Sequence, residues 1–350
     1  MTVRKRLLVA ALAAFLALFS CSSLAQKQTQ FRIAWSIYAG WMPWAYADSS
    51  GIMDKWADKY GIKVELVQIN DYIESVNQYT AGNMDGVAIT NMDTLTIPAA
   101  SGVDTTALLI NDYSDGNDGI VLKNADSLAD IKGRNVNLVQ FSVSHYFLAR
   151  ALESVGLSER DINTINTSDA DIVGIYANAD VDAVVAWNPQ LMAIDSMPNS
   201  NLVYTSQKIP REILDMMVVN TQTLKANPAL GRALTGAWYE VMARIVAGDE
   251  SALASMADAA GTDVAGYKKQ LEATHLYTDP SKAAELMNSD DLLATMQRIA
   301  EFSYQHGLLG PMAPGPDFLG IQSPAGVFGE KSNVMMRFEP SFTEQYAESK

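Results

Sequence analysis

From residue 31 onward, short β-branched runs alternate with longer amphipathic stretches, and this alternation constrains the fold more than any other feature of the chain. The short runs predict strands, and apolar residues spaced three or four apart predict helices. We expect strands at 31–35, 63–68, 87–90, 106–110, 135–139, 162–166 and 183–186. We expect helices at 51–60, 71–81, 92–101, 144–155, 169–178 and 228–247. This order of elements indicates an α/β fold.

Aromatic side chains are concentrated immediately after the first expected strand. The segment WSIYAGWMPW contains half of the Trp residues of the chain, and its aromatic residues are Trp35, Tyr38, Trp41 and Trp44. Gly40 and Pro43 interrupt the segment, which we expect to be a loop that leads into a helix. Binding groups of open α/β sheets gather beyond the strand ends, so the segment predicts an aromatic ligand pocket. The alternative is that these rings pack beneath the first helix, since Trp is usually well buried.

The N-terminus predicts export. Three basic residues at 4–6 precede an apolar stretch at 7–19 that is too short to span a bilayer, and small residues follow, so residues 1–25 are expected to be a signal peptide. Two processing routes stay open. Ser23-Leu24-Ala25 fits cleavage before Gln26, which would release a soluble periplasmic protein, and we favour this route. The run at 18–21 resembles a lipoprotein box in which Cys21, the one cysteine, would carry a membrane anchor.

The composition is acidic, with 25 Lys and Arg against 40 Asp and Glu. The expected signal peptide carries three of the basic residues and no acidic one, so its removal leaves 22 against 40, a net charge of about −18. A chain of this charge repels polyanions, which argues against nucleic acid as a partner. No later segment has the 18 or so uninterrupted apolar residues of a membrane helix, so we expect a membrane contact only if Cys21 is lipidated.

One internal similarity indicates two related halves. The runs TAGNMDGVAITNMD at 80–93 and ANADVDAVVAWNPQ at 177–190 align without gaps, each with an Asp before an apolar strand and an Asn after it. Asp85 then corresponds to Asp182, and Asn91 corresponds to Asn188. The simplest explanation is two lobes of similar topology, each of which presents the loop after an equivalent strand to a shared cleft.

Several motifs in this order resemble a known class of transport protein. They are the leader, the strand that runs into the aromatic segment, Gly82-x-x-Asp85, Leu128-x-x-Ile131-Lys132-Gly133, Gly156-Leu157 before Asp161, and Asp180-Val181-Asp182-Ala183 before Trp187-x-Pro189. Over 31–310 they resemble the nitrate/sulfonate/taurine class of ABC-transporter substrate-binding proteins. Within that class, WSIYAGWMPW and the runs at 55–62, 70–82 and 90–104 are similar to the branch encoded beside urea carboxylase, which is associated with guanidine breakdown.

This resemblance implies a type II periplasmic-binding-protein fold, in which two α/β lobes joined by two crossing segments close over a ligand. By that template, lobe one covers 27–112 and 217–325, lobe two covers 119–210, and the crossovers are 113–118 and 211–216. Residues 326–350 form a C-terminal extension to which the template assigns no role. The resemblance also implies a small-molecule ligand and an ABC-transporter membrane permease as partners. We expect a monomer without a cofactor.

The expected loops at strand ends and crossovers supply the candidate ligand-binding residues, and none of these is Lys or Arg. The candidates are Ser36, Tyr38, Trp41, Trp44, Asn91, Asp93, Asp112, Asp115, Asp118, Ser142, His145, Trp187, Asn188 and Asp215. Asp93 is the first choice among the carboxylates, because its loop belongs to the internal similarity, and Asp215 is the second. The run NDYSDGND also suits a plain turn, so we expect about one of its three aspartates to contact ligand. Ser142 could equally be a helix cap, and His145 could equally be a core residue.

Asp residues combined with Trp and Tyr suit a small cation, through charge-assisted hydrogen bonds and the negative faces of the rings. A guanidinium ion is flat enough to lie on an indole and can donate two parallel N–H bonds to one carboxylate. Urea is neutral and would not offset the burial of several carboxylates. Urea and a larger aromatic amine, such as a pyrimidine vitamin precursor, remain alternative ligands.

Catalytic and metal motifs are not found in the sequence. His145, His275 and His306 form no metal-ligand spacing, and the chain has no P-loop, GxSxG or GxGxxG run. We therefore expect a binding protein without a metal site. A hydrolase that uses Asp93 and His145 is the alternative from another functional class.

Overall fold

The computed structural model describes residues 28–350. The expected signal peptide and both processing routes, at Gln26 and at Cys21, lie outside this range. Between residues 28 and 350, no helix is both long and apolar enough to cross a membrane.

The larger of two sheets has the strand order β13-β12-β14-β4-β10-β3-β1-β2, and the short strand β11 pairs with β4. Its strands are β1 (Gln30–Trp35), β2 (Lys63–Gln68), β3 (Gly86–Thr90), β4 (Thr105–Ser114), β10 (Leu214–Asn220), β11 (Thr274–Leu276), β12 (Gly320–Ser323), β13 (Gly326–Phe328) and β14 (Val334–Phe338). All residues of β3 are buried, as are nearly all residues of β4 and β10. Helices cover this sheet, which explains why its central strands are apolar runs rather than alternating ones.

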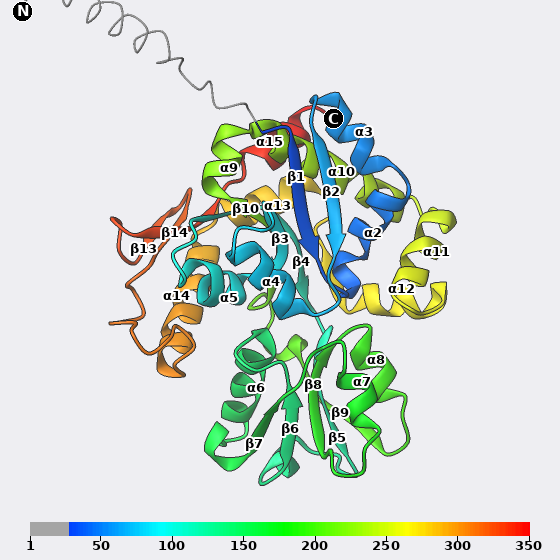
Figure 1. The fold of residues 1–350 in the computed structure, drawn as a ribbon. Coiled ribbons are helices and arrows are strands. Elements are labelled where there is room, and N and C mark those ends of the chain that lie inside the picture. Colours follow the sequence, from blue (N-terminus) through cyan, green and yellow to red (C-terminus); the bar gives the residue numbers. More distant parts are fainter. Residues whose placement is uncertain (1–27) are drawn as a thin grey trace, which may run out of the picture.

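The smaller sheet has the order β7-β6-β8-β5-β9. Its strands are β5 (Asp118–Lys123), β6 (Asn135–Leu138), β7 (Asn163–Asn166), β8 (Ala183–Trp187) and β9 (Ser200–Thr205). We call the part built on the larger sheet lobe one and the part built on the smaller sheet, residues 118–205, lobe two (Figure 1).

Fourteen helices cover the sheets within residues 28–350. Those of lobe one are α2 (Met42–Ser49), α3 (Ile52–Lys59), α4 (Tyr72–Thr80), α5 (Asn91–Thr94), α9 (Thr221–Ala226), α10 (Pro228–Val246), α11 (Glu250–Ala259), α12 (Val264–Glu272), α13 (Pro280–Met287), α14 (Asp290–Gln305) and α15 (Ser341–Glu348). Those of lobe two are α6 (Val143–Ser154), α7 (Ile172–Tyr176) and α8 (Gln190–Asp195). The α/β fold class predicted from the sequence is confirmed.

The five central strands of lobe one repeat the topology of lobe two. In lobe one, β1 lies parallel between β2 and β3, and β10 runs antiparallel between β3 and β4. In lobe two, β6 lies parallel between β7 and β8, and β5 runs antiparallel between β8 and β9. Each lobe therefore contains one strand, β10 or β5, that the chain supplies after returning from the other lobe.

The internal sequence similarity corresponds to the central strands β3 and β8 of the two sheets. The Asp85 carboxylate accepts a hydrogen bond from the Arg32 amide of β1 at 2.8 Å. The Asp182 carboxylate accepts the equivalent bond from the Asn135 amide of β6 at 3.3 Å. The two aspartates therefore have the same role in the two lobes, which is to fix the start of the neighbouring parallel strand.

Two elements near the cleft differ from the sequence-based expectation. The aromatic segment is a loop only at 36–38, because a 3₁₀ turn at Ala39–Trp41 leads directly into α2, whose first turn contains Pro43. Proline is favoured in the first turn of a helix, since its missing N–H would have no partner there. The expected helix at 92–101 is α5 followed by a wider π turn at Leu95–Ala99, with Pro98 inside it.

Two segments join the lobes, the first between β4 and β5 and the second between β9 and β10. Ser114, the last residue of β4, hydrogen-bonds the Asp118 carboxylate at 2.6 Å and the Ser206 hydroxyl at 2.7 Å. The Ser206 hydroxyl also accepts a bond from the Gly116 amide at 2.7 Å. The two connections are therefore held side by side by buried hydroxyl groups.

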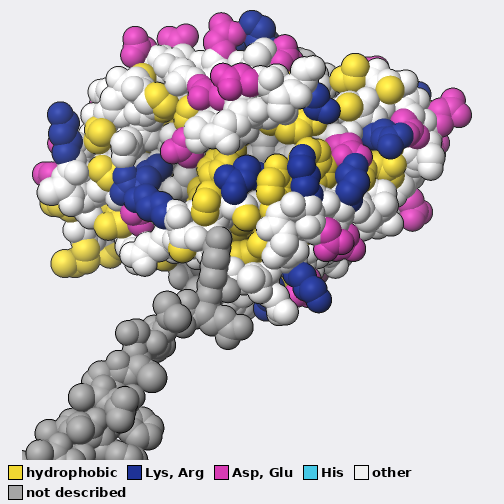
Figure 2. All heavy atoms as spheres, turned by 90° about the horizontal axis from the view of Figure 1, so that it is seen from above, with side chains coloured by type: hydrophobic (Ala, Val, Ile, Leu, Met, Phe, Trp, Pro, Cys, Tyr) yellow, Lys and Arg dark blue, Asp and Glu magenta, His cyan; other side chains and the backbone are white. Residues whose placement is uncertain are grey.

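Residues 326–350 are part of lobe one. Strand β14 adds to the sheet in parallel with β4, and α15 packs against α10 and α13. Arg337 of β14 forms paired bonds to the Asp104 carboxylate, both at 2.9 Å. On the face of lobe one that points away from lobe two, Lys and Arg side chains are interspersed with Asp, Glu and hydrophobic ones (Figure 2).

Candidate ligand-binding cleft

A small cavity lies between the lobes, with an empty volume of about 260 Å³. Residues from both lobes and from the second connection line it: Tyr38, Trp41, Tyr72, Thr90, Asp118, Val143, Trp187, Ile213 and Asp215. The lobes touch around it. The Ala39 amide donates to the Asn188 carbonyl at 3.0 Å, and the Trp187 indole N–H donates to the Ile37 carbonyl at 3.2 Å. The structure is therefore that of a closed cleft.

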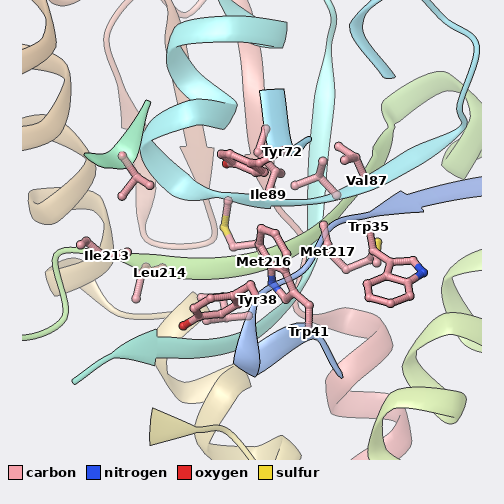
Figure 3. Packing of buried hydrophobic residues seen from close by; sticks show 14 of the residues in the cluster. Trp35, Tyr38, Trp41, Tyr72, Val87, Ile89, Ile213, Leu214, Met216 and Met217 are labelled. Atoms are coloured by element: carbon pink, nitrogen blue, oxygen red, sulfur yellow. The ribbon is translucent and has the colours of Figure 1, made fainter. Parts of the chain in front are cut away.

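Aromatic rings form the walls of this cavity. Tyr38 and Trp41 come from the segment after β1 and meet edge to face, with ring centres 5.1 Å apart. Tyr72, the first residue of α4, lies 5.7 Å from Trp41 and 5.6 Å from Trp187 between ring centres. Figure 3 shows Tyr38 and Trp41 close together beside β10. The four rings enclose a space with both flat and edge-on aromatic surfaces, which suits a small planar group.

Carboxylates from three strands converge on the same space. Asp118, from the start of β5, and Asp215, from β10, line the cavity. Asp112, on β4, lies directly opposite Asp215 in the antiparallel pairing and accepts a hydrogen bond from the Tyr38 hydroxyl at 2.9 Å. All three residues are buried. Within the described chain, Asp112 Oδ2 and Asp215 Oδ2 have no hydrogen-bond partner.

Burial dominates the electrostatics of these carboxylates. Loss of solvent raises the pKa of Asp118 to about 7. Loss of solvent also raises the pKa of Asp112. It raises the pKa of Asp215 as well, and the negative charges of Asp112 and Asp118 raise that pKa further. No Lys or Arg is among the lining residues found in the described part of the chain. The cleft is therefore a site of negative charge that only a proton or a bound cation can neutralise.

Asp93, the first choice of the sequence analysis, lies beside the cavity rather than on its wall. Its Oδ2 accepts three hydrogen bonds, from the Tyr72 hydroxyl at 2.7 Å, the Thr90 hydroxyl at 2.9 Å and the Val143 amide at 3.2 Å. Burial raises the pKa of Asp93 to about 6, against the lowering effect of these donors. Of the carboxylate candidates, Asp215 and Asp118 line the cavity, whereas Asp93 does not.

Four other candidates do not line the cavity. One packs in the core of lobe one, one fixes the second connection, and two bind backbone amides at the start of a helix. Trp44 stacks obliquely on Trp238 in the core of lobe one, with ring centres 5.0 Å apart. The Asn91 side chain accepts from the Leu214 amide at 3.1 Å and donates to the Glu212 carbonyl at 3.0 Å, which fixes the second connection. The Asn188 side chain accepts from the Met192 amide at the start of α8, and Ser142 caps α6.

The remaining candidates also lie off the cavity wall. Ser36 is fully buried, and its hydroxyl has no partner among residues 28–350. Asp115 is partly exposed at the first connection. His145 bonds Glu159, which also bonds His306 of lobe one at 2.7 Å. Asp93 and His145 thus belong to two separate hydrogen-bond networks, and the pairing that a hydrolase would need is not formed. No cluster of metal-ligating side chains occurs within residues 28–350.

Four lining residues were missed by the sequence analysis: Tyr72, Thr90, Val143 and Ile213. Tyr72 and Val143 are each the first residue of a helix that follows a strand, and Thr90 is the last residue of β3. These three residues could have been predicted from the sequence, because ligands of open α/β sheets bind in the crevice beyond the strand ends, which these positions face. Ile213 precedes β10, a strand that the sequence analysis did not include.

A family model matches much of the sequence that builds this cleft. The model described as NMT1/THI5-like covers residues 55–252, more than half of the chain. The chain belongs to the NMT1/THI5-like family. Among curated proteins, none matches this chain.

Solved structures similar to this NMT1/THI5-like protein share its two-lobed fold. The alkanesulfonate-binding protein SsuA from Xanthomonas axonopodis pv. citri, bound to MOPS, is 18% identical with a TM-score of 0.66, over 81% of this chain and 95% of that one. The nitrate-binding protein NrtA from Synechocystis PCC 6803 is 12% identical with a TM-score of 0.59, over 92% and 98%. The desulfurization enzyme DSZB is 13% identical with a TM-score of 0.56, over 80% and 93%. These likenesses establish the periplasmic-binding-protein fold, which hosts both receptors and an enzyme.

Proposed function

We propose that this protein is the extracytoplasmic substrate-binding component of an ABC importer and that its ligand is a small planar organic cation, best represented by guanidinium. The observation that carries the proposal is the pair Asp118 and Asp215, two buried carboxylates on the wall of a small aromatic cavity that no basic side chain of residues 28–350 lines. The fold and the family support the transport role. The membrane permease of such an importer is the expected partner.

The charge of the cavity selects a cation. A buried carboxylate without a partner costs several kcal/mol of desolvation energy, so Asp118 and Asp215 are stable there only if protonated or paired. A bound cation supplies charge-assisted hydrogen bonds to them and interacts with the faces of the surrounding rings. A neutral ligand such as urea offers the shape and the donors but leaves the charges unneutralised.

The size of the cavity selects a small ligand. Pockets for drug-sized ligands span roughly 300–1,000 Å³, whereas the cavity volume open to the centre of a water molecule is here only about 10 Å³. Guanidinium has N–H donors in one plane around a single carbon. It can therefore donate hydrogen bonds to carboxylates on two sides while one of its faces lies against an aromatic ring. Either ligand requires the walls to move apart, and a pyrimidine-sized amine requires a larger movement than guanidinium does.

The same chemistry argues against the anions named for two of the structural relatives. Anion sites in proteins use Lys, Arg or free N–H groups at a helix N-terminus. At the N-terminus of α6, the helix that faces the cleft from lobe two, the Val143 amide donates to Asp93 and the Ser144 amide donates to the Ser142 hydroxyl. A sulfonate or nitrate would meet carboxylates instead of donors.

Isothermal titration of the purified protein with guanidinium, urea, nitrate and taurine at matched ionic strength tests the proposal. We expect saturable binding of guanidinium at a stoichiometry of one and weaker binding of urea. We expect no heat from nitrate or from taurine, a zwitterion whose sulfonate would meet the carboxylates. Binding of nitrate or taurine in preference to guanidinium would overturn the proposal. Product analysis after prolonged incubation with guanidinium and urea tests the hydrolase alternative, and we expect both compounds to be recovered unchanged.

A further inference from the structure

Asp93 of lobe one reaches across the cleft to the first helical residue of lobe two. Its Oδ2 accepts the Val143 amide, which is the first N–H of α6 and has no intrahelical acceptor. The Tyr72 and Thr90 hydroxyls of lobe one also donate to this oxygen, so that three donors surround it. Three donors, one of them at the N-terminus of a 12-residue helix, form the kind of environment that binds a free anion.

Asp93 is an integral part of this arrangement. Asp93 has no exposed surface. The Thr90 hydroxyl donates to the Asp93 carboxylate and also accepts a hydrogen bond from the Asp93 amide. The Tyr72 hydroxyl that donates to Asp93 accepts the Thr90 amide at 3.2 Å. The Ser144 hydroxyl, one residue further into α6, is fully buried and has no partner among residues 28–350. A set of donors for an anion is therefore built between the lobes, and Asp93 Oδ2 occupies it, whereas Asp93 Oδ1 has no partner among residues 28–350.

We propose that Asp93 is an internal anion that sets the charge selectivity of the cleft, because its carboxylate fills the anion site formed by Tyr72, Thr90 and the N-terminus of α6. A ligand that enters the wild-type cleft then meets the carboxylates of Asp118 and Asp215, neither of which has a basic partner among the described lining residues, and no free anion site. The proposal rests on the proposed function for the statement that the natural ligand is a cation. The occupied anion site itself does not depend on that ligand.

Asp93 also links charge selectivity to closure of the cleft. Its bonds to Tyr72 and Thr90 lie within lobe one, whereas its bond to Val143 joins the lobes and would break if they separated. The opposite lobe makes the same kind of contact, since Asp169 accepts the first N–H of α4, the Tyr72 amide, at 3.0 Å. Each lobe thus supplies one carboxylate to a helix N-terminus of the other.

Replacement of Asp93 by Ala should open this anion site. The substitution removes a carboxylate and leaves the three donors in place, and the space so created matches formate. Chemical complementation tests this expectation. We expect sodium formate to raise the melting temperature of the Asp93→Ala protein, and butyrate at the same ionic strength, which is too long for the space, to have no such effect. Wild-type protein should respond to neither anion, since its own carboxylate fills the site.

The matched control is Asp112→Ala, which removes an equally buried carboxylate. Its surroundings are Asp215, Asp118 and one donor, the Tyr38 hydroxyl, so formate should not stabilise this variant. If formate stabilises Asp93→Ala and Asp112→Ala equally, or stabilises neither, the proposal is wrong. Should Asp93→Ala be recovered unfolded, refolding yield in formate against butyrate gives the same comparison.

A second readout connects the site to ligand binding. Asp93→Ala loses the charge-assisted contact with Val143 that joins the lobes. We expect the dissociation constant of guanidinium to rise about tenfold or more in this variant, and formate to restore the wild-type value. Stabilisation by formate without any guanidinium binding, in wild type or variant, would support the internal anion and overturn the ligand assignment. Guanidinium binding that is unchanged in Asp93→Ala and insensitive to formate would overturn the role of Asp93 and leave the receptor function intact.

Discussion

Asp112 and Asp215 lie directly opposite each other on the antiparallel strands β4 and β10, and both are buried beside the same cavity. Two neighbouring carboxylates of this kind cannot both be ionised without a large cost, and burial raises the pKa of each. Because β10 is supplied to lobe one only after the chain has returned from lobe two, the pair joins residues that are 103 positions apart in the sequence. A cation in the cavity would relieve the repulsion between the two side chains.

Removal of the Asp118 charge is expected to weaken guanidinium binding. Asp118→Asn keeps the shape of the side chain, and loss of a charge-assisted contact of about 1.5–3 kcal/mol raises the dissociation constant roughly ten- to hundredfold. Titration calorimetry measures this change. Asp115→Asn, three residues away and partly exposed, is the control and should bind as wild type does. Equal affinities of the two variants would show that Asp118 does not contact the ligand.

Trp41 and Trp44 are expected to respond differently to the same substitution. Trp41 lines the cavity, so Trp41→Leu should weaken guanidinium about thirtyfold, from a cation–π contribution of about 2 kcal/mol, and weaken urea less. Trp44 packs on Trp238, so Trp44→Leu should lower the melting temperature of the ligand-free protein and leave affinity nearly unchanged. Thermal melts and titrations with both ligands separate the two roles. The reverse pattern would place the ligand elsewhere.

Guanidinium affinity is expected to fall as the pH drops below about 7. Burial raises the pKa of Asp118 to about 7, so below that pH the ligand must displace a proton, and affinity falls by up to about tenfold per pH unit for each proton displaced. Proton release should appear as a dependence of the binding enthalpy on the buffer. An affinity that is independent of pH between about 5 and 8 would indicate that these carboxylates do not titrate with the ligand.

The ligand-free protein should show the opposite trend in stability. A carboxyl whose pKa is higher in the folded than in the unfolded state binds more protons when folded, so its contribution to the free energy of unfolding is lost as pH rises through about 4 to 7. Asp93, Asp112, Asp118 and Asp215 all shift in this direction. We expect the melting temperature without ligand to be higher near pH 5 than near pH 8, and saturating guanidinium to reduce that difference.

Gly40 is expected to tolerate no side chain. A Cβ at this position would collide with the Asp112 carboxylate and would lie 2.6 Å from the Tyr38 ring. Gly40→Ala should therefore displace Asp112 and lower guanidinium affinity by more than the Asp112→Asn change does, because it moves two cavity groups instead of one. Gly174→Ala, where the added Cβ meets no atom, is the control. Wild-type affinity in Gly40→Ala would show that Asp112 and Tyr38 need not hold their positions.

Much of the fold was predictable from the sequence because it depends on local patterns. Each of the seven expected strands is present. The strands β5 and β9 to β14 were missed. The residues that begin β5 belong to the run NDYSDGND, which has the composition of a turn, so local propensity gave no sign that they cross between lobes.

The sequence by itself determined the chemical character of the cleft: aromatic and acidic groups at strand ends, with no basic residue among the candidates. Only the tertiary structure decided which of these groups meet. Trp41 ends the 3₁₀ turn and lines the cavity, whereas Trp44, inside α2, packs on Trp238 in the core. Asp93 is held by donors from both lobes, and Asp118 and Asp215 line the cavity. Spacing along the chain specifies a side chain's local direction, whereas its partner across a cleft depends on strand pairing and lobe closure between residues distant in sequence.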